Sequence, residues 1–209
     1  FTPLVKRLTK PGARDGVPLV VGVAGGTGSG KTTLARAILR AREEQQHEVS
    51  GYDNEEHDGS PPVTYISHDS YYRDLGHLPM GEREKSNFDH PDSLETDLLV
   101  EHIRDLKDGR TVNVPKYDYS THTRVVGKDA TTLALPAPVI LVEGILILSH
   151  PELVSLLDIK IFVDTEDDVR LIRRIQRDTV ERGRDVEGII NQYLKTVRPM
   201  HVAYVEPSR

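Results

Sequence analysis

Eight consecutive residues between a predicted strand and a predicted helix have the spacing of a phosphate-binding loop. They read GGTGSGKT, from Gly25 to Thr32, and fit the pattern G-x-x-x-x-G-K-[ST]. Glycines let backbone N–H groups turn inward around a phosphate, and the following helix presents its positive N-terminal end to the anion. We expect Lys31 to reach the outer phosphates and the Thr32 hydroxyl to bind Mg²⁺. The alternative, a glycine-rich turn with a chance lysine, is disfavoured because both the spacing and the flanking elements match.

Two carboxylates follow predicted strands. Asp69 ends the strand-like run YISHD, and Glu143 lies near the end of the run VILVEG. A carboxylate at the carboxyl end of a central strand points into the crevice where α/β sheets bind ligands. Glu143 is therefore a candidate Mg²⁺ ligand, directly or through water, with a strand terminator or helix cap as the alternative. For Asp69 the choice between a turn residue and a residue that carries chemistry stays open on these grounds alone.

Four arginines recur at helical spacing further along the chain. They stand at positions i, i+3, i+4 and i+7: Arg170, Arg173, Arg174 and Arg177. A helix would place them on one face, where like charges repel unless something anionic lies opposite. Nearby acids offer some relief: Glu166, Asp167 and Asp178. The alternative is a solvated face with ion pairs.

The segment ERGRD, residues 181–185, has the features of a lid. Gly183 interrupts the helix and spaces Arg182 from Arg184. Arginines that close over a polyphosphate stabilise the charge that develops on a transferring phosphoryl group. Because a phosphate-binding loop is present in the same chain, we favour a phosphate-related function for four arginines: Arg174, Arg177, Arg182 and Arg184.

These candidate residues need a scaffold, and the apolar pattern predicts a sheet between helices. Four near-continuous apolar runs predict strands at 17–26, 63–67, 138–144 and 159–165. Helical patterns lie at 31–43, 91–109 and 151–157. Buried strands that alternate with helices are typical of an α/β fold with a parallel sheet covered on both faces.

Two further elements have predictable limits. The helix over 91–109 can be capped by Asp92 or Ser93 and ended by Gly109. Its expected buried stripe is Leu94, Leu98, Leu99, Ile103 and Leu106. The segment 111–135 alternates polar and apolar residues, with Gly127-Lys128 between its halves, which predicts an antiparallel hairpin.

The length and composition of the chain exclude several classes of protein. The 209 residues suffice for one domain, 1–209, and a net charge of −6 argues against a general nucleic-acid-binding surface. The absence of cysteine excludes disulfides and fits a cytoplasmic protein. No apolar run reaches the roughly 18 residues of a membrane span, so we expect no membrane partner. The polar, acidic stretch 43–62 predicts a mobile surface loop.

Several motifs together resemble the uridine kinases (uridine–cytidine kinases). They stand in that family's order: GGTGSGKTT, DSYYR, NFDHPDSL, VPKYDYSTHTR, VEGIL, ERGRD and NQYLKTVRPMH. The resemblance runs from about Val17 to Arg209, except for the acidic loop. The phosphate loop is shared by a vast superfamily, whereas NFDHPD with YDYSTHTR and ERGRD is far more specific. The resemblance implies a P-loop fold with a hairpin clamp and an arginine-rich lid over 170–192. It also implies a homotetramer that uses ATP or GTP with Mg²⁺ to phosphorylate the 5′-hydroxyl of uridine or cytidine in pyrimidine salvage.

The resemblance also implies residue roles. Asp69 matches the carboxylate that accepts the hydroxyl proton near Mg²⁺. The implied catalytic residues are Asp69, Lys31, Arg174 and Arg177, and the metal-side residues are Thr32, Asp69 and Glu143. The implied nucleotide contacts are Gly25, Gly26, Thr27, Gly28, Ser29, Gly30, Lys31, Thr32, Thr33 and Arg182. The implied substrate contacts are Tyr72, Asp89, Tyr117, Tyr119, His122, Arg174, Arg184 and Gln192.

The residues support part of this without the resemblance. Aromatic side chains near a carboxylate suit a nucleoside, and a sugar diol suits an ionised acceptor such as Asp89. In the alternative without a substrate role, Tyr72 packs in the core, Asp89 is a turn residue and His122 lies on the surface of the hairpin. Tyr71 is taken as packing, and His68 receives no role. The choice of a pyrimidine rests on the resemblance alone.

Departures from the family pattern leave alternatives open. The stretch 43–62 is longer than usual, and relatives continue beyond VEPSR into a further strand and helix. A phosphoribulokinase-like or pantothenate-kinase-like enzyme would act on another hydroxyl, but a sugar phosphate would favour basic residues on the hairpin rather than His122. A non-catalytic nucleotide-binding regulator would be expected to lack at least one member of a set that is intact here: Asp69, Lys31, Thr32, Glu143 and the lid arginines.

Overall fold

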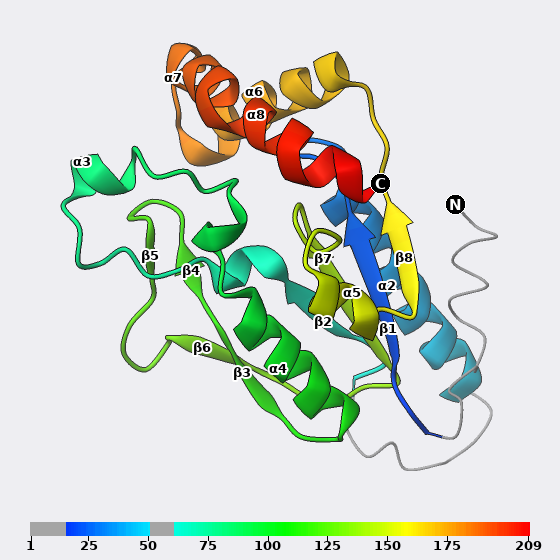
Figure 1. Ribbon diagram of the computed structural model, residues 1–209. Helices are drawn as coiled ribbons and strands as arrows, with labels where there is room; N and C mark the ends of the chain where they lie inside the picture. The colour runs from blue at the N-terminus through cyan, green and yellow to red at the C-terminus, as the bar shows by residue number, and fades with distance from the viewer. Residues whose placement is uncertain (1–15, 51–60) are drawn as a thin grey trace.

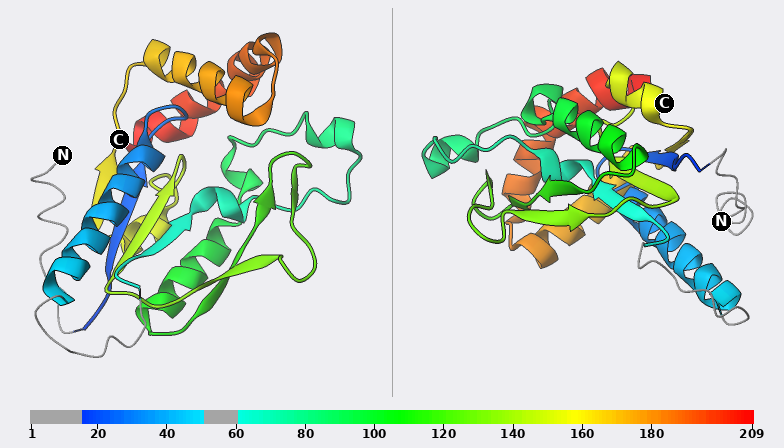
Figure 2. Two further views of the ribbon diagram at one scale, coloured as in Figure 1. Left: turned by 180° about the vertical axis from the view of Figure 1, so that it is seen from behind. Right: turned by 90° about the horizontal axis from the view of Figure 1, so that it is seen from below.

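A parallel sheet lies at the centre of the molecule, with helix α2 on one face and helices α4 and α5 on the other (Figure 1, Figure 2). The computed structural model describes residues 16–50 and 61–209. The strand order is β2-β7-β1-β8, and all pairs are parallel. The strands are β2 (Thr64–Ser67), β7 (Val139–Gly144), β1 (Leu19–Ala24) and β8 (Ile159–Phe162). The predicted α/β fold class is confirmed.

The alternation of side chains along β1 explains how one sheet makes two cores. Val20 and Ala24 pack with α4 (Thr96–Lys107) and α5 (Pro151–Leu156), whereas Val21 and Val23 pack against α2. Successive side chains of a strand point to opposite faces, so both faces of the sheet are apolar and both need a helical cover.

Helix α2 (Lys31–Ser50) is longer than the sequence pattern indicated. The expectation that a loop begins at Glu43 is wrong, because the helix continues through Ser50. Glutamate and glutamine favour helices, so a polar composition does not by itself end one. Residues 51–60 of the expected acidic loop lie outside the described residues. Within the described part of the chain, no helix is long and apolar enough to cross a membrane.

The start of α4 also differs from the prediction. Residues Pro91–Ser93 form a separate 3₁₀ turn, and α4 begins at Thr96 without a side-chain cap. The prediction that Asp92 or Ser93 caps this helix is wrong, because the Ser93 hydroxyl donates to the carbonyls of Phe88 and His90 (2.9 and 2.6 Å) instead. Leu94 is buried but lies before the helix, in a bridge to Tyr72.

The hairpin consists of two short antiparallel ladders. Strand β3 (Val112–Pro115) pairs with β6 (Thr131–Ala134), and β4 (Tyr117–Asp118) pairs with β5 (Thr123–Arg124). The tip lies at 119–122, not at Gly127-Lys128 as expected. The Asp118 carboxylate accepts from the Ser120 N–H at 2.8 Å, which is the side-chain turn that aspartate favours. Gly127 instead forms a second turn on the returning arm, with φ of +89°.

The C-terminal helices lie above the carboxyl ends of β1 and β8 (Figure 1). Helix α6 (Asp167–Arg182) ends at Gly183, whose φ of +62° is the left-handed conformation that closes helices. Helix α7 (Val186–Gln192) begins at Asp185, which accepts from the Gly188 N–H at 2.7 Å. Helical turns then continue through α8 (Arg198–Met200) to Ser208, and α3 (Met80–Arg83) is a short separate turn.

Candidate active site

The phosphate loop lies between β1 and α2. Gly25, Gly28 and Gly30 have φ of +149°, +75° and +96°, conformations that side chains rarely adopt. These angles account for the glycines in the motif. Ser29 and Lys31 are buried, and Lys31 is the first residue of α2. Thr33, which was also predicted to contact the nucleotide, is exposed on the same helix.

Helix α6 packs directly on this loop. A Cβ atom added to Gly28 would lie 2.3 Å from the Arg170 carbonyl oxygen, and one added to Gly26 would lie 2.2 Å from Arg170 Nη1. Arg173 Nη1 donates to the Ser29 carbonyl at 3.5 Å. Arg170 and Arg174 of α6 are therefore buried toward the phosphate loop, whereas Arg173 contacts the loop but stays exposed.

Substituting Gly28→Ala is expected to lower the free energy of unfolding by at least about 1–2 kcal/mol and to weaken nucleotide binding. The left-handed conformation costs about that much for a residue with a Cβ, and the Arg170 backbone would also have to move. Urea unfolding and an ATP titration measure the two effects. Gly81→Ala is the matched control, because an added Cβ there meets nothing within 4 Å. Wild-type stability and ATP affinity in Gly28→Ala would contradict this prediction.

Glu143 is buried at the end of β7 and is surrounded by hydroxyl groups. It accepts from Thr32 Oγ1 at 3.3 Å, from the Tyr65 hydroxyl at 3.1 Å and from Ser67 Oγ at 3.3 Å. Burial raises the pKa of the Glu143 carboxyl, and the nearby Lys31 charge opposes this rise. Sequence reasoning missed Tyr65 and Ser67. They alternate along β2, which pairs with β7, so strand pairing was the signal that could have found them.

Thr32 and Glu143 could hold Mg²⁺. Hydroxyl and carboxylate oxygens are ligands of the type this cation prefers, and it is commonly bound by one or two carboxylates together with substrate phosphates. In residues 16–50 and 61–209, no group of three histidine or acidic side chains is close enough to form a complete metal site. The donor set therefore fits a metal ion that arrives with a phosphate ligand.

Asp69 lies in the short helical turn His68–Tyr71, directly after β2. Its Oδ2 accepts from the Tyr119 hydroxyl at 3.4 Å, and the Arg182 guanidinium lies 4.9 Å from the centre of the Tyr119 ring. The hairpin and the lid thus both reach Asp69 through one aromatic side chain.

His68 supports the turn that carries Asp69. Burial lowers the pKa of His68 to about 4, so the ring is neutral near pH 7, and its Nε2 lies 3.1 Å from Thr96 Oγ1. A Cβ added to Gly144 would lie 2.5 Å from the His68 Cβ. His68 therefore packs against the residue that follows Glu143, which places the two carboxylate-bearing segments side by side.

Aromatic side chains form a cluster next to Asp69. The Tyr72 ring lies 5.0 Å from that of Tyr117 and 5.8 Å from that of Phe88, and Phe88 stacks on His122 at 4.9 Å. Burial raises the pKa of Tyr117 to about 12 and lowers that of His122. In the described part of the chain, the buried Tyr117 hydroxyl has no hydrogen-bond partner. Phe88 was missed because NFDHP was examined for its acid alone. Tyr71 packs away from this cluster, as expected, with its hydroxyl 2.8 Å from His102 Nδ1.

The Asp89 carboxyl lies within range of charges from several parts of the site. Burial raises the pKa of its carboxyl, the positive charges of Arg174 and Lys31 oppose the rise, and the negative charge of Asp69 adds to it. These electrostatic neighbours come from the phosphate loop, the lid helix and the turn after β2. The structure therefore brings Asp89 together with the phosphate-loop residues.

The lid arginines have different partners. Arg174 is buried, and it donates from Nη1 to Thr27 Oγ1 at 3.2 Å and from Nη2 to Gln192 Oε1 at 2.8 Å. Arg184 Nη1 donates to the same Gln192 oxygen at 2.7 Å. Arg177 instead binds the buried Asp178, with Nε 2.8 Å and Nη2 2.7 Å from Oδ1. Of the four arginines assigned to phosphate, Arg177 is thus the one that donates a hydrogen bond to a carboxylate.

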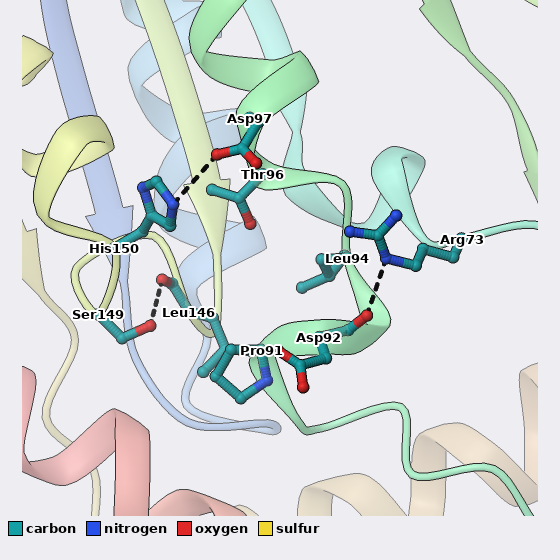
Figure 3. A pocket seen from close by; sticks show the side chains of 9 residues that line it. All are labelled: Arg73, Pro91, Asp92, Leu94, Thr96, Asp97, Leu146, Ser149 and His150. Atoms are coloured by element: carbon teal, nitrogen blue, oxygen red, sulfur yellow. Dashed lines mark hydrogen bonds and ion pairs between the residues drawn. The ribbon is translucent and has the colours of Figure 1, made fainter.

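A separate cavity of about 150 Å³ lies between the 91–97 segment and the loop after β7 (Figure 3). Arg73, Leu94 and His150 line it, and no residue predicted for the site does so. His150 Nε2 lies 3.4 Å from Asp97 Oδ1 at its edge. We therefore distinguish this cavity from the candidate active site.

Three features together define a P-loop kinase. They are a phosphate loop at the end of a parallel strand, two acids beside that loop and an arginine-bearing helix that packs on it. The chain belongs to the phosphoribulokinase/uridine kinase family, whose family model matches residues 20–209.

Relatives of known name are similar over most of the chain. A uridine kinase of Chloroflexus aurantiacus is 50% identical over 192 residues, which cover 92% of this chain and 83% of that protein. A uridine kinase of Streptococcus gordonii is 47% identical, with 92% and 82% covered. A solved Bacillus stearothermophilus structure, described as a possible uridine kinase, matches with a TM-score of 0.57 at 21% identity, covering 95% of this chain and 92% of that one. At that identity the structural match supports the fold alone.

Proposed function

We propose that the protein transfers the γ-phosphoryl group of ATP or GTP to the 5′-hydroxyl of uridine or cytidine, forming UMP or CMP. The observation that carries this proposal is the contact between Tyr119 and Asp69 at 3.4 Å, because it joins an aromatic hairpin to an acid beside the phosphate loop. The names of the relatives, uridine kinases at 50% and 47% identity, support the choice of nucleoside.

In this proposal the phosphate loop and Lys31 bind the donor phosphates. Asp69 takes the proton from the 5′-hydroxyl as the new oxygen–phosphorus bond forms and the bond to the β-phosphate oxygen breaks, releasing ADP or GDP. Arg174, Arg182 and Arg184 stabilise the negative charge on the transferring group. When bound, Mg²⁺ would be held by Thr32, Asp69 and Glu143 and would neutralise charge on the phosphates.

The nucleoside side of the site uses the aromatic cluster. Asp89 accepts from the sugar hydroxyls, and Tyr72 contacts the sugar. Tyr117, Tyr119 and His122 form the wall of the base pocket, where the buried, unpaired Tyr117 hydroxyl of the described structure suits a hydrogen bond to a base. Gln192 holds Arg174 and Arg184 together at the edge of this pocket.

A nucleotide-coupled assay tests the proposed function. We expect turnover with uridine and cytidine, and none with ribulose 5-phosphate or pantothenate, with the monophosphate product identified by mass spectrometry. The Lys31→Met variant, purified in parallel, controls for contaminating kinases. Turnover of one of the other two acceptors in place of the nucleosides would favour the related kinases, and ATP binding without any turnover would favour a regulator.

Three further properties belong to the same proposal. The chain forms a single kinase domain over 1–209, it assembles as a homotetramer, and it resides in the cytoplasm. The tetramer rests on the family resemblance, and the cytoplasm on the absence of cysteine from the sequence. Light scattering of the purified chain would contradict the tetramer if it gave the mass of a monomer or dimer.

A further inference from the structure

Asp178 is a buried carboxylate that the proposed mechanism does not use. It lies on the inward face of α6, four residues after Arg174, and its side chain is 0% exposed. A buried carboxylate is unfavourable unless charged partners and hydrogen bonds compensate for the lost water. Its surroundings should therefore show what stabilises it.

Four arginines converge on this one side chain. Arg177 alone makes a hydrogen bond, from Nε to Oδ1 at 2.8 Å, and its Nη2 lies 2.7 Å from the same oxygen. Arg182 Nη1 lies 3.6 Å from Oδ1, while Arg174 Nε and Arg184 Nη1 each lie 3.7 Å from Oδ2. Those three distances exceed a direct hydrogen bond, and Oδ2 accepts none in the described part of the chain. Asp178 thus attracts three arginines without accepting a direct hydrogen bond from any of them.

The Asp178 backbone sets the direction of the same arginines. Its carbonyl oxygen accepts from the Gly183 N–H and, at 3.1 Å, from the Arg184 N–H, so it closes α6 where the chain turns into the lid. Arg182 and Arg184 leave the helix on either side of this turn. Both the side chain and the backbone of Asp178 therefore fix where these guanidinium groups lie.

The charges do not balance, because one carboxylate faces four guanidinium groups. Asp89 is a further carboxylate whose charge acts on Arg174, and the cluster still keeps an excess of positive charge near the phosphate loop, which Arg174 reaches through Thr27. We infer that Asp178 is a positioning residue that gathers Arg174, Arg182 and Arg184 for a polyphosphate, and that Arg177 is the fixed partner of Asp178 rather than a phosphate contact. The expected effect on kcat rests on the proposed function. The expected effect on the binding of a polyphosphate does not.

The test compares Asp178→Asn with Glu181→Gln, which removes one exposed carboxylate from the same helix. We expect Asp178→Asn to lower kcat for uridine about 10- to 10²-fold, since small displacements of catalytic groups have effects of that size, with the KM for uridine within about 3-fold of wild type. Glu181→Gln should match wild type. A purely structural role would lower the melting temperature without changing kcat per folded molecule, and that result would overturn the inference.

A second measurement does not depend on uridine turnover. Without Asp178 the three arginines are no longer held together, so tripolyphosphate alone should raise the melting temperature of Asp178→Asn by less than it raises that of wild type or Glu181→Gln. Equal increments would overturn the inference. If wild type fails to phosphorylate nucleosides while the increments differ as expected, the proposed function fails and the positioning role stands.

The double variant Arg177→Gln/Asp178→Asn covers the case in which Asp178→Asn does not fold. It keeps the net charge of the cluster but lacks the carboxylate that gathers the other arginines. We expect its kcat to stay at least about 10-fold below wild type. Recovery of wild-type kcat would show that net charge, and not Asp178, matters.

Discussion

The Asp69→Asn variant is expected to lose about 10²- to 10⁴-fold in kcat for uridine, the range that general acid–base catalysis contributes. Asparagine keeps an oxygen that can accept from the Tyr119 hydroxyl, so the hairpin contact at 3.4 Å can persist. It cannot take the proton of the attacking hydroxyl. Single-turnover measurements at saturating ATP and uridine separate this loss from any change in binding.

The control for this variant is Asp129→Asn, which neutralises an exposed carboxylate on the returning arm of the hairpin. It should retain wild-type kcat, and the ATP dissociation constant should stay within about 3-fold of wild type in both variants, because the phosphate loop, Lys31, Thr32 and Glu143 still bind the donor and its Mg²⁺. A kcat within about 3-fold of wild type in Asp69→Asn would remove this residue from the role of base. The transition state of phosphoryl transfer is loose, so part of the effect is expected to come from positioning of the hydroxyl.

The second large effect is expected for Lys31→Met, which keeps the length of the side chain and removes its charge. Lys31 is buried at the start of α2, where the charge sits in a medium that screens it poorly. We expect kcat/KM for ATP to fall about 10²- to 10³-fold, as when one preorganised donor to a developing charge is removed. Steady-state kinetics with varied ATP at saturating uridine measure this loss.

Removing the Lys31 charge also affects Glu143. That charge opposes the rise in the Glu143 pKa caused by burial, so the pKa should rise further in Lys31→Met. Lys128→Met, an exposed lysine of the hairpin, is the matched control and should match wild type. Unchanged kcat/KM for ATP in Lys31→Met would show that this lysine does not reach the phosphates.

Much of the fold follows from local pattern in the sequence. The apolar strands, the glycines of the phosphate loop and the stop at Gly183 each reflect a property of a few neighbouring residues. Two of the wrong predictions arose where a side chain has several possible hydrogen-bond partners nearby. Ser93 donates to carbonyls before it instead of capping α4, and Asp118 turns the hairpin earlier than Gly127.

Site residues could be predicted from the sequence where they belong to a single motif. They could not be predicted where the pairing of two distant strands brings them together. Tyr65 and Ser67 act on Glu143, which is more than 70 residues away, through the pairing of β2 with β7. The spacing of the arginines predicts that they share one face of a helix. It does not predict whether that face points toward the protein interior or toward solvent. In α6 the inward side chains are Arg170, Arg174 and Asp178, while Ile172 and Val180 are 55% and 84% exposed.

That reversed orientation has a thermodynamic consequence for the lid. Where α6 meets the phosphate loop, the contact consists of guanidinium groups, hydroxyls and carbonyl oxygens, so separating the two exposes little apolar surface at that contact. Heat-capacity changes arise mainly from apolar hydration, so this movement should have a small one, unlike unfolding of the two cores beneath it. The free energy of lid docking should therefore change nearly linearly with temperature, unlike the free energy of unfolding, which is curved. It should depend strongly on the anions present.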